Sequence, residues 1–494
     1  MKHKLPACIT PMVFTALAIT AQVAAQQAPR YKLIDLGTLG GPNSTEGPQA
    51  PIVTDTGSVV GVADTSIPDP LCSSDCFISH AFQWKKGTLR DLGTIPGGSR
   101  SDAIWANRLG LIIGTSENGL INPLVGVPEK RAVLWQKDGR IIDLGTLGGN
   151  DSSAFAINNH GQIVGGALND IPDPFSFPGL ATQARAFLWQ NGVMQDLGTL
   201  GGPDSFATSI NDRGQIAGIS MTDSTPNATT GFPTFHPFLW ENGRMLDLGS
   251  LGGTQAAPEG DGLEAQHALN NRGWVVGGST LSGDSTTHPF LWNGTKLLDL
   301  GTLGGTFGVA RAVNDAGDVA GAATTANDEA VHAFLWRKGN MIDLGTIDGD
   351  SCSLAHFMNA SSQIVGSSFD CADFVELHGF VWQPGGQMID LNAFVPPESD
   401  LIITDGESIN DRGEIAGSGM LPNGDFHAVL LIPCGPDDTN GCQESSGAET
   451  LVRRSLSAAP HRNAASRDSF NSMRPLRGWP ANRWFGTIPR TSPQ

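Results

Sequence analysis

The 494-residue chain carries a net charge of −19 and is rich in glycine, with 63 glycines and a single tyrosine. The charge is uneven, because residues 451–494 hold eight arginines and one aspartate, so the remaining chain carries −26. So acidic a body argues against nucleic acid or an anionic membrane surface as a partner. Abundant glycine and proline favour many short strands joined by tight turns.

The N-terminus has the pattern of a secretory signal peptide. Residues 1–4 are basic, an apolar run follows to about Ala21, and small residues lead up to Ala25. This pattern predicts a signal peptide over 1–25 and an exported protein, secreted, periplasmic or attached to the cell surface. No later segment is apolar for long enough to cross a bilayer, so no transmembrane segment is expected after cleavage.

One unit of about fifty residues recurs through residues 26–433, the length expected of propeller repeats. It reads Asp-Leu-Gly-Thr-Leu-Gly-Gly, then Ala-x-Ala-Ile-Asn-Asp-x-Gly-Gln-Ile-Val-Gly, then a variable segment, then His-Ala-Phe-Leu-Trp. Four strand-like runs in each unit indicate the blades of a β-propeller. A β-solenoid is the alternative, although its rungs are usually much shorter. The aspartate of Asp-Leu stands at Asp35, Asp91, Asp143, Asp196, Asp247, Asp299, Asp343 and Asp390.

Two tight turns divide each unit into hairpins. The first is Asn-Asp-x-Gly, as in residues 211–214, and the second is Asn-Gly or a similar pair, as in residues 242–243. The chain begins with a lone fourth run at 33–36 and ends with a third run at 427–431 that lacks its fourth. We therefore expect an all-β propeller of eight four-stranded blades, closed by the N-terminal strand, which leaves no open edge.

The turns and the longer segments are expected on opposite faces. Tight turns share one face, whereas the Gly-Thr-Leu-Gly-Gly connectors share the other with the variable loops. The longest of these loops are residues 62–79, 115–130, 166–184 and 219–235. Long loops on a rigid scaffold are where function usually lies, so this face is the expected binding face.

Histidine opens the third strand of six units. With a turn at residues 338–339, Phe334 faces Asp343, which makes His332 and Asp343 diagonal neighbours on one side of the sheet. An enzyme needs only one such site, so the repetition predicts a structural tie. The histidines are His80, His236, His288, His332, His378 and His427, with Arg131 and Arg185 in the other two units, and their expected partners include Asp91, Asp247, Asp299, Asp343 and Asp390.

Six cysteines follow the signal peptide, and an oxidising compartment favours disulfides between them. Six cysteines allow fifteen connectivities, and the local pairs are Cys72/Cys76, Cys352/Cys371 and Cys434/Cys442. Cys72 and Cys76 could begin a zinc site, but no second Cys or His pair stands nearby at metal spacing. The Asn-Asp-x-Gly turns lack the converging oxygens of a calcium loop. No metal and no cofactor is expected.

No catalytic motif stands out. The sequence has no Gly-x-Ser-x-Gly, no His-Glu-x-x-His and no phosphate-binding loop. Trp105 and Trp274 lie outside the repeated tryptophan position, as sugar-stacking candidates or as core residues. Carboxylates in the variable loops could serve an enzyme, but nothing singles out two of them; they are Asp69, Asp75, Glu117, Glu129, Asp173, Asp223 and Glu264.

The repeated unit resembles the bacterial extracellular HAF-repeat family over roughly residues 31–433. The family is named for the triplet His-Ala-Phe, which is present at residues 332–334. The triplet differs in several other units, for example His-Pro-Phe at 236–238. The resemblance implies bacterial export and a repeat fold, and it brings no reaction and no catalytic residues. Some relatives end in a Pro-Glu-Pro sorting signal, which this chain lacks.

The leading hypothesis is a secreted, monomeric binding or cell-surface interaction module whose long loops bind an extracellular glycan or protein. A polysaccharide hydrolase or lyase with its site at the channel mouth is the first alternative, and a passive extracellular structural protein is the second. The sequence favours a role without catalysis. Residues 434–494 drop the repeat, and their composition predicts a cysteine-containing, basic and disordered tail.

Overall fold

The structure is a computed structural model that describes residues 29–45, 51–70, 76–173, 176, 181–228, 230–258, 267–372, 377–435, 438 and 441–444. The signal peptide predicted over residues 1–25 lies outside this range, as do Cys72, Asp75 and Glu264. The basic segment 451–494 also lies outside it.

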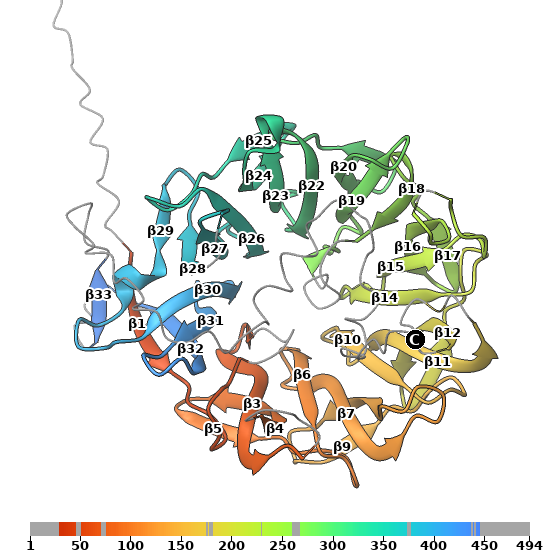
Figure 1. The fold of residues 1–494 in the computed structure, drawn as a ribbon, viewed down its shortest axis with the longest axis horizontal. Coiled ribbons are helices and arrows are strands. Elements are labelled where there is room, and N and C mark those ends of the chain that lie inside the picture. Colours follow the sequence, from red (N-terminus) through yellow and green to blue (C-terminus); the bar gives the residue numbers. More distant parts are fainter. Residues whose placement is uncertain are drawn as a thin grey trace, which may run out of the picture.

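Antiparallel sheets stand around a common axis, which is the arrangement of a β-propeller (Figure 1). Four sheets have four strands each. They join β2 (Ile52–Val53), β3 (Ser58–Pro68), β4 (Phe77–Lys85) and β5 (Thr88–Asp91); β6 (Ser101–Ala106), β7 (Ile112–Ile121), β8 (Pro128–Trp135) and β9 (Ile141–Asp143); β10 (Ser152–Ile157), β11 (Ile163–Pro172), β12 (Thr182–Gln190) and β13 (Val193–Asp196); and β26 (Cys352–Met358), β27 (Ile364–Phe369), β28 (Leu377–Trp382) and β29 (Met388–Asp390).

A twelve-stranded sheet repeats the same pattern three times. Its strands are β14 (Ser205–Ile210), β15 (Ile216–Met221), β16 (Phe235–Glu241), β17 (Arg244–Asp247), β18 (Gly252–Ala257), β19 (Val275–Leu281), β20 (Thr287–Trp292), β21 (Leu297–Asp299), β22 (Gly304–Val313), β23 (Val319–Thr325), β24 (Val331–Arg337) and β25 (Asn340–Asp343). Single parallel pairs, Phe235 with Gln255 and Thr287 with Phe307, join the three four-stranded groups. The short 3-10 helices η2 (Ala326–Asp328) and η3 (Leu391–Phe394) lie beside the strands.

The two ends of the repeats meet in the last sheet. It joins β30 (Ile402–Ile409), β31 (Ile415–Met420), β32 (Phe426–Pro433), β1 (Arg30–Asp35) and β33 (Cys442–Glu444). The pairing of β1 with β32 sets Leu33 opposite Leu431. The predicted contact between the N-terminal strand and the last repeat is therefore confirmed.

Strand β33 extends this sheet beyond the predicted end of the repeats. It pairs with the free edge of β1, and Cys434 and Cys442, whose Cα atoms are 6.2 Å apart, form a disulfide. Disorder was expected from residue 434 onward, but residues 442–444 are a strand. The composition of the segment did not reveal that the closing strand leaves an unpaired edge for it to cover.

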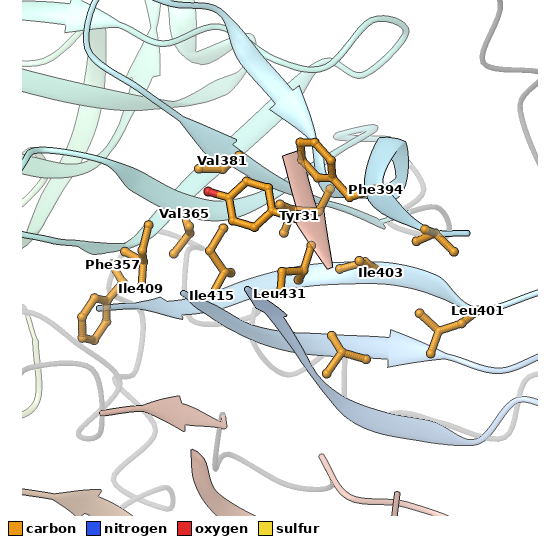
Figure 2. Packing of buried hydrophobic residues seen from close by; sticks show 13 residues of the cluster. Tyr31, Phe357, Val365, Val381, Phe394, Leu401, Ile403, Ile409, Ile415 and Leu431 are labelled. Atoms are coloured by element: carbon orange, nitrogen blue, oxygen red, sulfur yellow. The ribbon is translucent and has the colours of Figure 1, made fainter. Parts of the chain in front are cut away.

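Apolar packing holds the closing strand in place. Tyr31 is buried between β32 and η3, and its ring centroid lies 4.8 Å from that of Phe394 (Figure 2). The same cluster includes Ile403, Val429 and Leu431 from the last sheet. Burial raises the pKa of the Tyr31 hydroxyl to about 12. The N-terminal strand is thus a core element of the ring.

The Asn-Asp-x-Gly turns link neighbouring four-stranded groups on one face. Asn211 accepts the N–H groups of Arg213 and Gln215 on its Oδ1 and donates from Nδ2 to the carbonyl of Asn270 at 2.9 Å. Gly214 has φ +75°, the left-handed position predicted for this turn. Equivalent bonds from one group to the next start at Asn107, Asn158, Asn270, Asn359 and Asn410. We call this chain of bonds the asparagine belt.

Candidate functional site

Three hairpins rise from neighbouring sheets on the face opposite the asparagine belt. They are β3–β4, β7–β8 and β11–β12, and each continues well past the point where the other hairpins turn. Segments 62–79, 115–130 and 166–184 were expected to be loops, but most of their described residues are strand. These strand parts contain few β-branched residues and carry proline or polar residues near their distal ends, so their sequence has the composition of a loop. In the fourth segment, 219–235, the described residues between β15 and β16 are mainly irregular.

The three hairpins share one construction. In each, the strand register shifts beyond the main ladder, and a single pair then closes the distal end. The closing pairs are Pro68 with Phe77, Ile121 with Pro128 and Pro172 with Thr182. Proline cannot donate a ladder hydrogen bond, so a strand end is one of the positions where it is tolerated.

Large aliphatic side chains are exposed at corresponding places on these hairpins. Leu124 lies in the turn of β7–β8, and the others lie at the distal ends of the strands. We call the set the apolar arc: Ile67 (53% exposed), Leu120 (58%), Ile121 (56%), Leu124 (56%) and Ile171 (48%). Solvent-facing aliphatic residues that recur on adjacent elements mark an interaction surface more often than scattered ones do.

Polar contacts hold the long hairpins against the connectors that lead into the neighbouring sheets. The connector that enters the second sheet places Arg100 against Asp69 of the first hairpin. The connector that enters the third sheet places Asp151 where it accepts bonds from Asn122 Nδ2 at 2.7 Å and from the Lys130 N–H at 2.8 Å. These contacts place connectors and long hairpins on one face, as predicted, and they hold the apolar arc on a rigid base.

The loop carboxylates have separate local partners. Glu129 accepts from Asn118 Nδ2 at 2.8 Å and pairs with Arg131, and Asp223 accepts the N–H of Thr225 at 2.9 Å. Burial raises the pKa of Glu117. The backbone N–H of Asp173 donates to Ala181. Within the described parts of the chain, no three His, Cys, Asp or Glu residues are grouped so that they could hold a metal ion.

Three aromatic side chains contact one another near the axis of the ring. Trp105 on β6 lies 5.2 Å from His267 and 6.1 Å from Phe357 on β26, between ring centroids, and His267 lies 3.7 Å from Phe357. β6 and β26 are inner strands of sheets that are not neighbours (Figure 1), and His267 precedes β19, so these contacts join distant parts of the ring. Burial lowers the pKa of His267 to about 4, so its ring is neutral at neutral pH. Trp105 is thus an axial packing residue.

Trp274, the other unmatched tryptophan, lies elsewhere. It packs at the edge of the cluster formed by Val276 and Val319, and the Arg272 guanidinium stands 5.5 Å from its ring centroid. The structure therefore does not bring Trp105 and Trp274 together as one sugar-stacking surface.

The sequence did not single out a second group of residues, which is charged and lies beside the axis. Arg311 Nη1 donates to His356 Nδ1 at 3.3 Å, so the proton of the neutral imidazole is on Nε2, which lies 3.1 Å from Ser367 Oγ and 3.4 Å from Asp405. A histidine with this tautomer cannot accept the serine proton, so the group lacks the geometry of a Ser-His-Asp triad. Arg311 and His356 occupy β-bulges at equivalent positions, in Ala-Arg-Ala and Ala-His-Phe, where charged or ionisable residues in a variable position of the repeat are a signal that could have marked them.

The histidine–aspartate contact is present in five units. His332 Nδ1 donates to Asp343 at 2.9 Å, and the hydrogen bond raises the pKa of His332. Asp343 also accepts the N–H of Gly345 at 2.8 Å, so it shapes the turn after its strand. The pairs are His80–Asp91, His236–Asp247, His288–Asp299, His332–Asp343 and His427–Asp35.

His378 departs from this pattern, so its expected contact with Asp390 is wrong. His378 Nδ1 donates to Asp350 at 3.0 Å. Asp390 accepts from the Asn392 N–H at 2.8 Å at the start of η3, as Asp343 does from Gly345, and burial raises the pKa of Asp390. Asp350 lies in the connector between β25 and β26, and the chain reads Asp-Leu-Asn at 390–392 in place of Asp-Leu-Gly.

Two of the three proposed cysteine pairs are within disulfide distance. Cys352 and Cys371 have Cα atoms 5.3 Å apart, and Cys434 and Cys442 join as described above. The pair Cys72/Cys76 includes a residue outside the described range. No helix in the described residues is long and apolar enough to span a membrane.

No family model and no curated protein sequence matches the chain. Its structure is similar to the β-propeller domain of the Trilobed protease from Pyrococcus furiosus, at 10% identity and a TM-score of 0.41 over 73% of this chain and 99% of that chain. Dipeptidyl peptidase 4 from Porphyromonas gingivalis is 9% identical, with a TM-score of 0.45 over 80% of this chain and 58% of that one. Acylaminoacyl peptidase from Pyrococcus horikoshii is 11% identical, with a TM-score of 0.38 over 69% and 52%. The chain thus spans little more than half of these two peptidases.

Proposed function

We propose that the protein is an exported binding module that recognises an extracellular glycan or protein through the apolar arc. One observation carries this proposal, namely that three neighbouring hairpins expose aliphatic side chains at corresponding positions. The other exposed large aliphatic residues are single and lie apart, as Val193, Leu246 and Ile342 do on outer strands. A rigid apolar surface supplies binding energy without an ordering cost, which suits recognition.

We further propose that the ring has eight blades and belongs with the HAF-repeat proteins. The strand pairing supports this count, since the two single parallel pairs in the twelve-stranded sheet divide it into three sets of four. The disulfides are compatible with an oxidising compartment and so with export. The scaffold role of the five His–Asp pairs belongs to the same proposal, because their repetition serves the blades equally.

Binding to arrays of glycans and of extracellular proteins tests the function. The arc variant combines Ile67→Asp, Leu120→Asp and Ile171→Asp, and the control variant combines Val193→Asp, Leu246→Asp and Ile342→Asp. Both add three negative charges at exposed aliphatic positions. We expect at least a tenfold loss of binding in the arc variant only. An equal loss in both variants contradicts the proposal, and so does turnover of a glycan in a parallel hydrolysis assay.

A further inference from the structure

The surroundings of the apolar arc restrict what can cover it. The arc is uncharged, but it stands on a body whose net charge is −26. Two such bodies repel each other, so a second copy is a poor occupant at low salt. The fitting partner is a basic segment with apolar side chains, because it gains from both the charge of the body and the apolar area of the arc.

The chain itself contains a segment of this chemistry. Residues 451–494 carry a net charge of +7, and two of the chain's tryptophans, Trp479 and Trp484, stand among its arginines. Arginine and tryptophan are the side chains that contribute most to binding surfaces, since they pair large contact area with charge or a polar group.

The attachment point places this segment within reach of the arc. The last described residue, Glu444, pairs with Arg30 in the sheet that closes the ring. The first hairpin, β3–β4, belongs to the next sheet, since Asn410 of the closing sheet donates to the carbonyl of Thr54 just before β3. Fifty residues of extended chain can span roughly 165 Å. A domain of about 400 residues has a radius of gyration of only about 21 Å.

We propose that residues 451–494 dock on the apolar arc of the same molecule and cover it. Trp479 and Trp484 pack on the exposed aliphatic side chains, and the arginines lie over the acidic body around them. A tethered segment reaches an effective concentration of about millimolar, so a weak contact suffices to keep it bound. This inference rests on the proposed function, because the segment competes with an external partner for the surface that binds it.

Amide hydrogen exchange on the purified protein tests the docking. The mature full chain is compared with a chain ending at Glu444 and with a full chain carrying Trp479→Ser and Trp484→Ser. We expect amides of residues 66–70, 118–127 and 169–172 to exchange at least tenfold faster in both altered proteins. Residues 222–228, in the loop of the hairpin that lacks the arc, serve as the internal reference and should not change. The difference should shrink at 500 mM salt, because arginine contacts with the body are screened.

Two outcomes overturn the inference. Equal exchange in all three proteins means that the segment does not cover the arc. Protection that disappears on dilution, together with a dimer in light scattering, means that the segment docks on a second copy. Neither outcome affects the proposed function, which is decided by the arrays with the arc and control variants. If both proposals hold, the chain ending at Glu444 binds its partner at least tenfold more tightly than the full chain.

Discussion

The two faces of the ring follow different rules. On the tight-turn face, the asparagine belt repeats the same bond between neighbouring groups of strands with few exceptions. On the opposite face, three hairpins are long and carry the apolar arc, whereas the second strands elsewhere end early, at Met221, Leu281, Thr325, Phe369 and Met420. Features that every unit shares hold the ring together, and features confined to a few units are free to serve recognition.

The physical basis of this difference is burial. Asn211 is buried, so its amide needs partners inside the protein, and it finds them in its own turn and at the Asn270 carbonyl of the next four-stranded group. The exposed end of β7 faces water and has no such requirement, so its sequence can vary without loss of stability. The following predictions test whether stability lies with the repeated features and function with the variable ones.

The largest effect is expected from loss of the closing strand. Deletion of residues 31–37 removes Tyr31 from the core and exposes the edge of β32. We expect aggregation and loss of cooperative thermal unfolding, because an open edge pairs with other chains. Size-exclusion chromatography and calorimetry measure this, and the chain ending at Glu444 is the control. A soluble deletion protein of unchanged stability contradicts the closure.

Removal of the axial tryptophan should come next. Trp105→Ala removes a partly buried ring packed between β6 and β26, and we expect a cost of about 2–3 kcal/mol, at or below the low end for a fully buried tryptophan. We expect Trp105→Phe to retain most of the free energy of unfolding, because a smaller ring still fills part of the axis. Urea denaturation measures both variants. A cost below about 1 kcal/mol for Trp105→Ala would mean that the axis is not tightly packed.

The asparagine belt should show an intermediate effect. Asn211→Ala leaves a buried carbonyl and two turn N–H groups without their partner, at a cost of about 1–3 kcal/mol in free energy of unfolding. Asn423→Ala is the matched control on the other face, since Asn423 bonds only within its own exposed turn in the hydrogen bonds seen for it. We expect the control to change stability by less than about 0.5 kcal/mol. Similar costs for both variants would remove the distinction between the faces.

The smallest effect is expected from a single His–Asp pair. His332→Gln should cost about 0.2–1 kcal/mol, because the aspartate is nearly half exposed and the pair is screened by water. The hydrogen bond raises the pKa of His332, so its stabilisation is complete below the unfolded pKa of about 6.5 and is lost as pH rises through the folded value.

Asp343 sets the lower limit of the pH range in which the His332–Asp343 pair stabilises the protein. Burial raises its pKa, but bonds from His332 and the Gly345 N–H lower it by more, so its net pKa lies below 3.8. That stabilisation is present above pH 3.8 and is lost as pH falls through the folded value. The stability difference between wild type and His332→Gln should therefore be largest between about pH 4 and 6.5. A difference that grows above pH 8 would exclude the charged pair.

The sequence by itself determined the repeat, its turns, the closing strand and the contact between His332 and Asp343. These features depend on local turn geometry and on the two-residue period of a strand, both of which can be read along the chain. His378 shows the limit of this method, since a neighbouring connector supplies Asp350 in place of the expected partner.

Only the tertiary structure decided which residues meet across the ring or stand side by side on it. Trp105 on β6, Phe357 on β26 and His267 before β19 are far apart in sequence and come into contact only because the sheets surround one axis. The segments carrying Ile67, Leu120 and Ile171 were expected to be loops on one face, but they extend strands of three neighbouring sheets and expose aliphatic side chains at corresponding positions. Closure of the ring creates both sets, and no local pattern encodes which distant side chains a closed ring brings together.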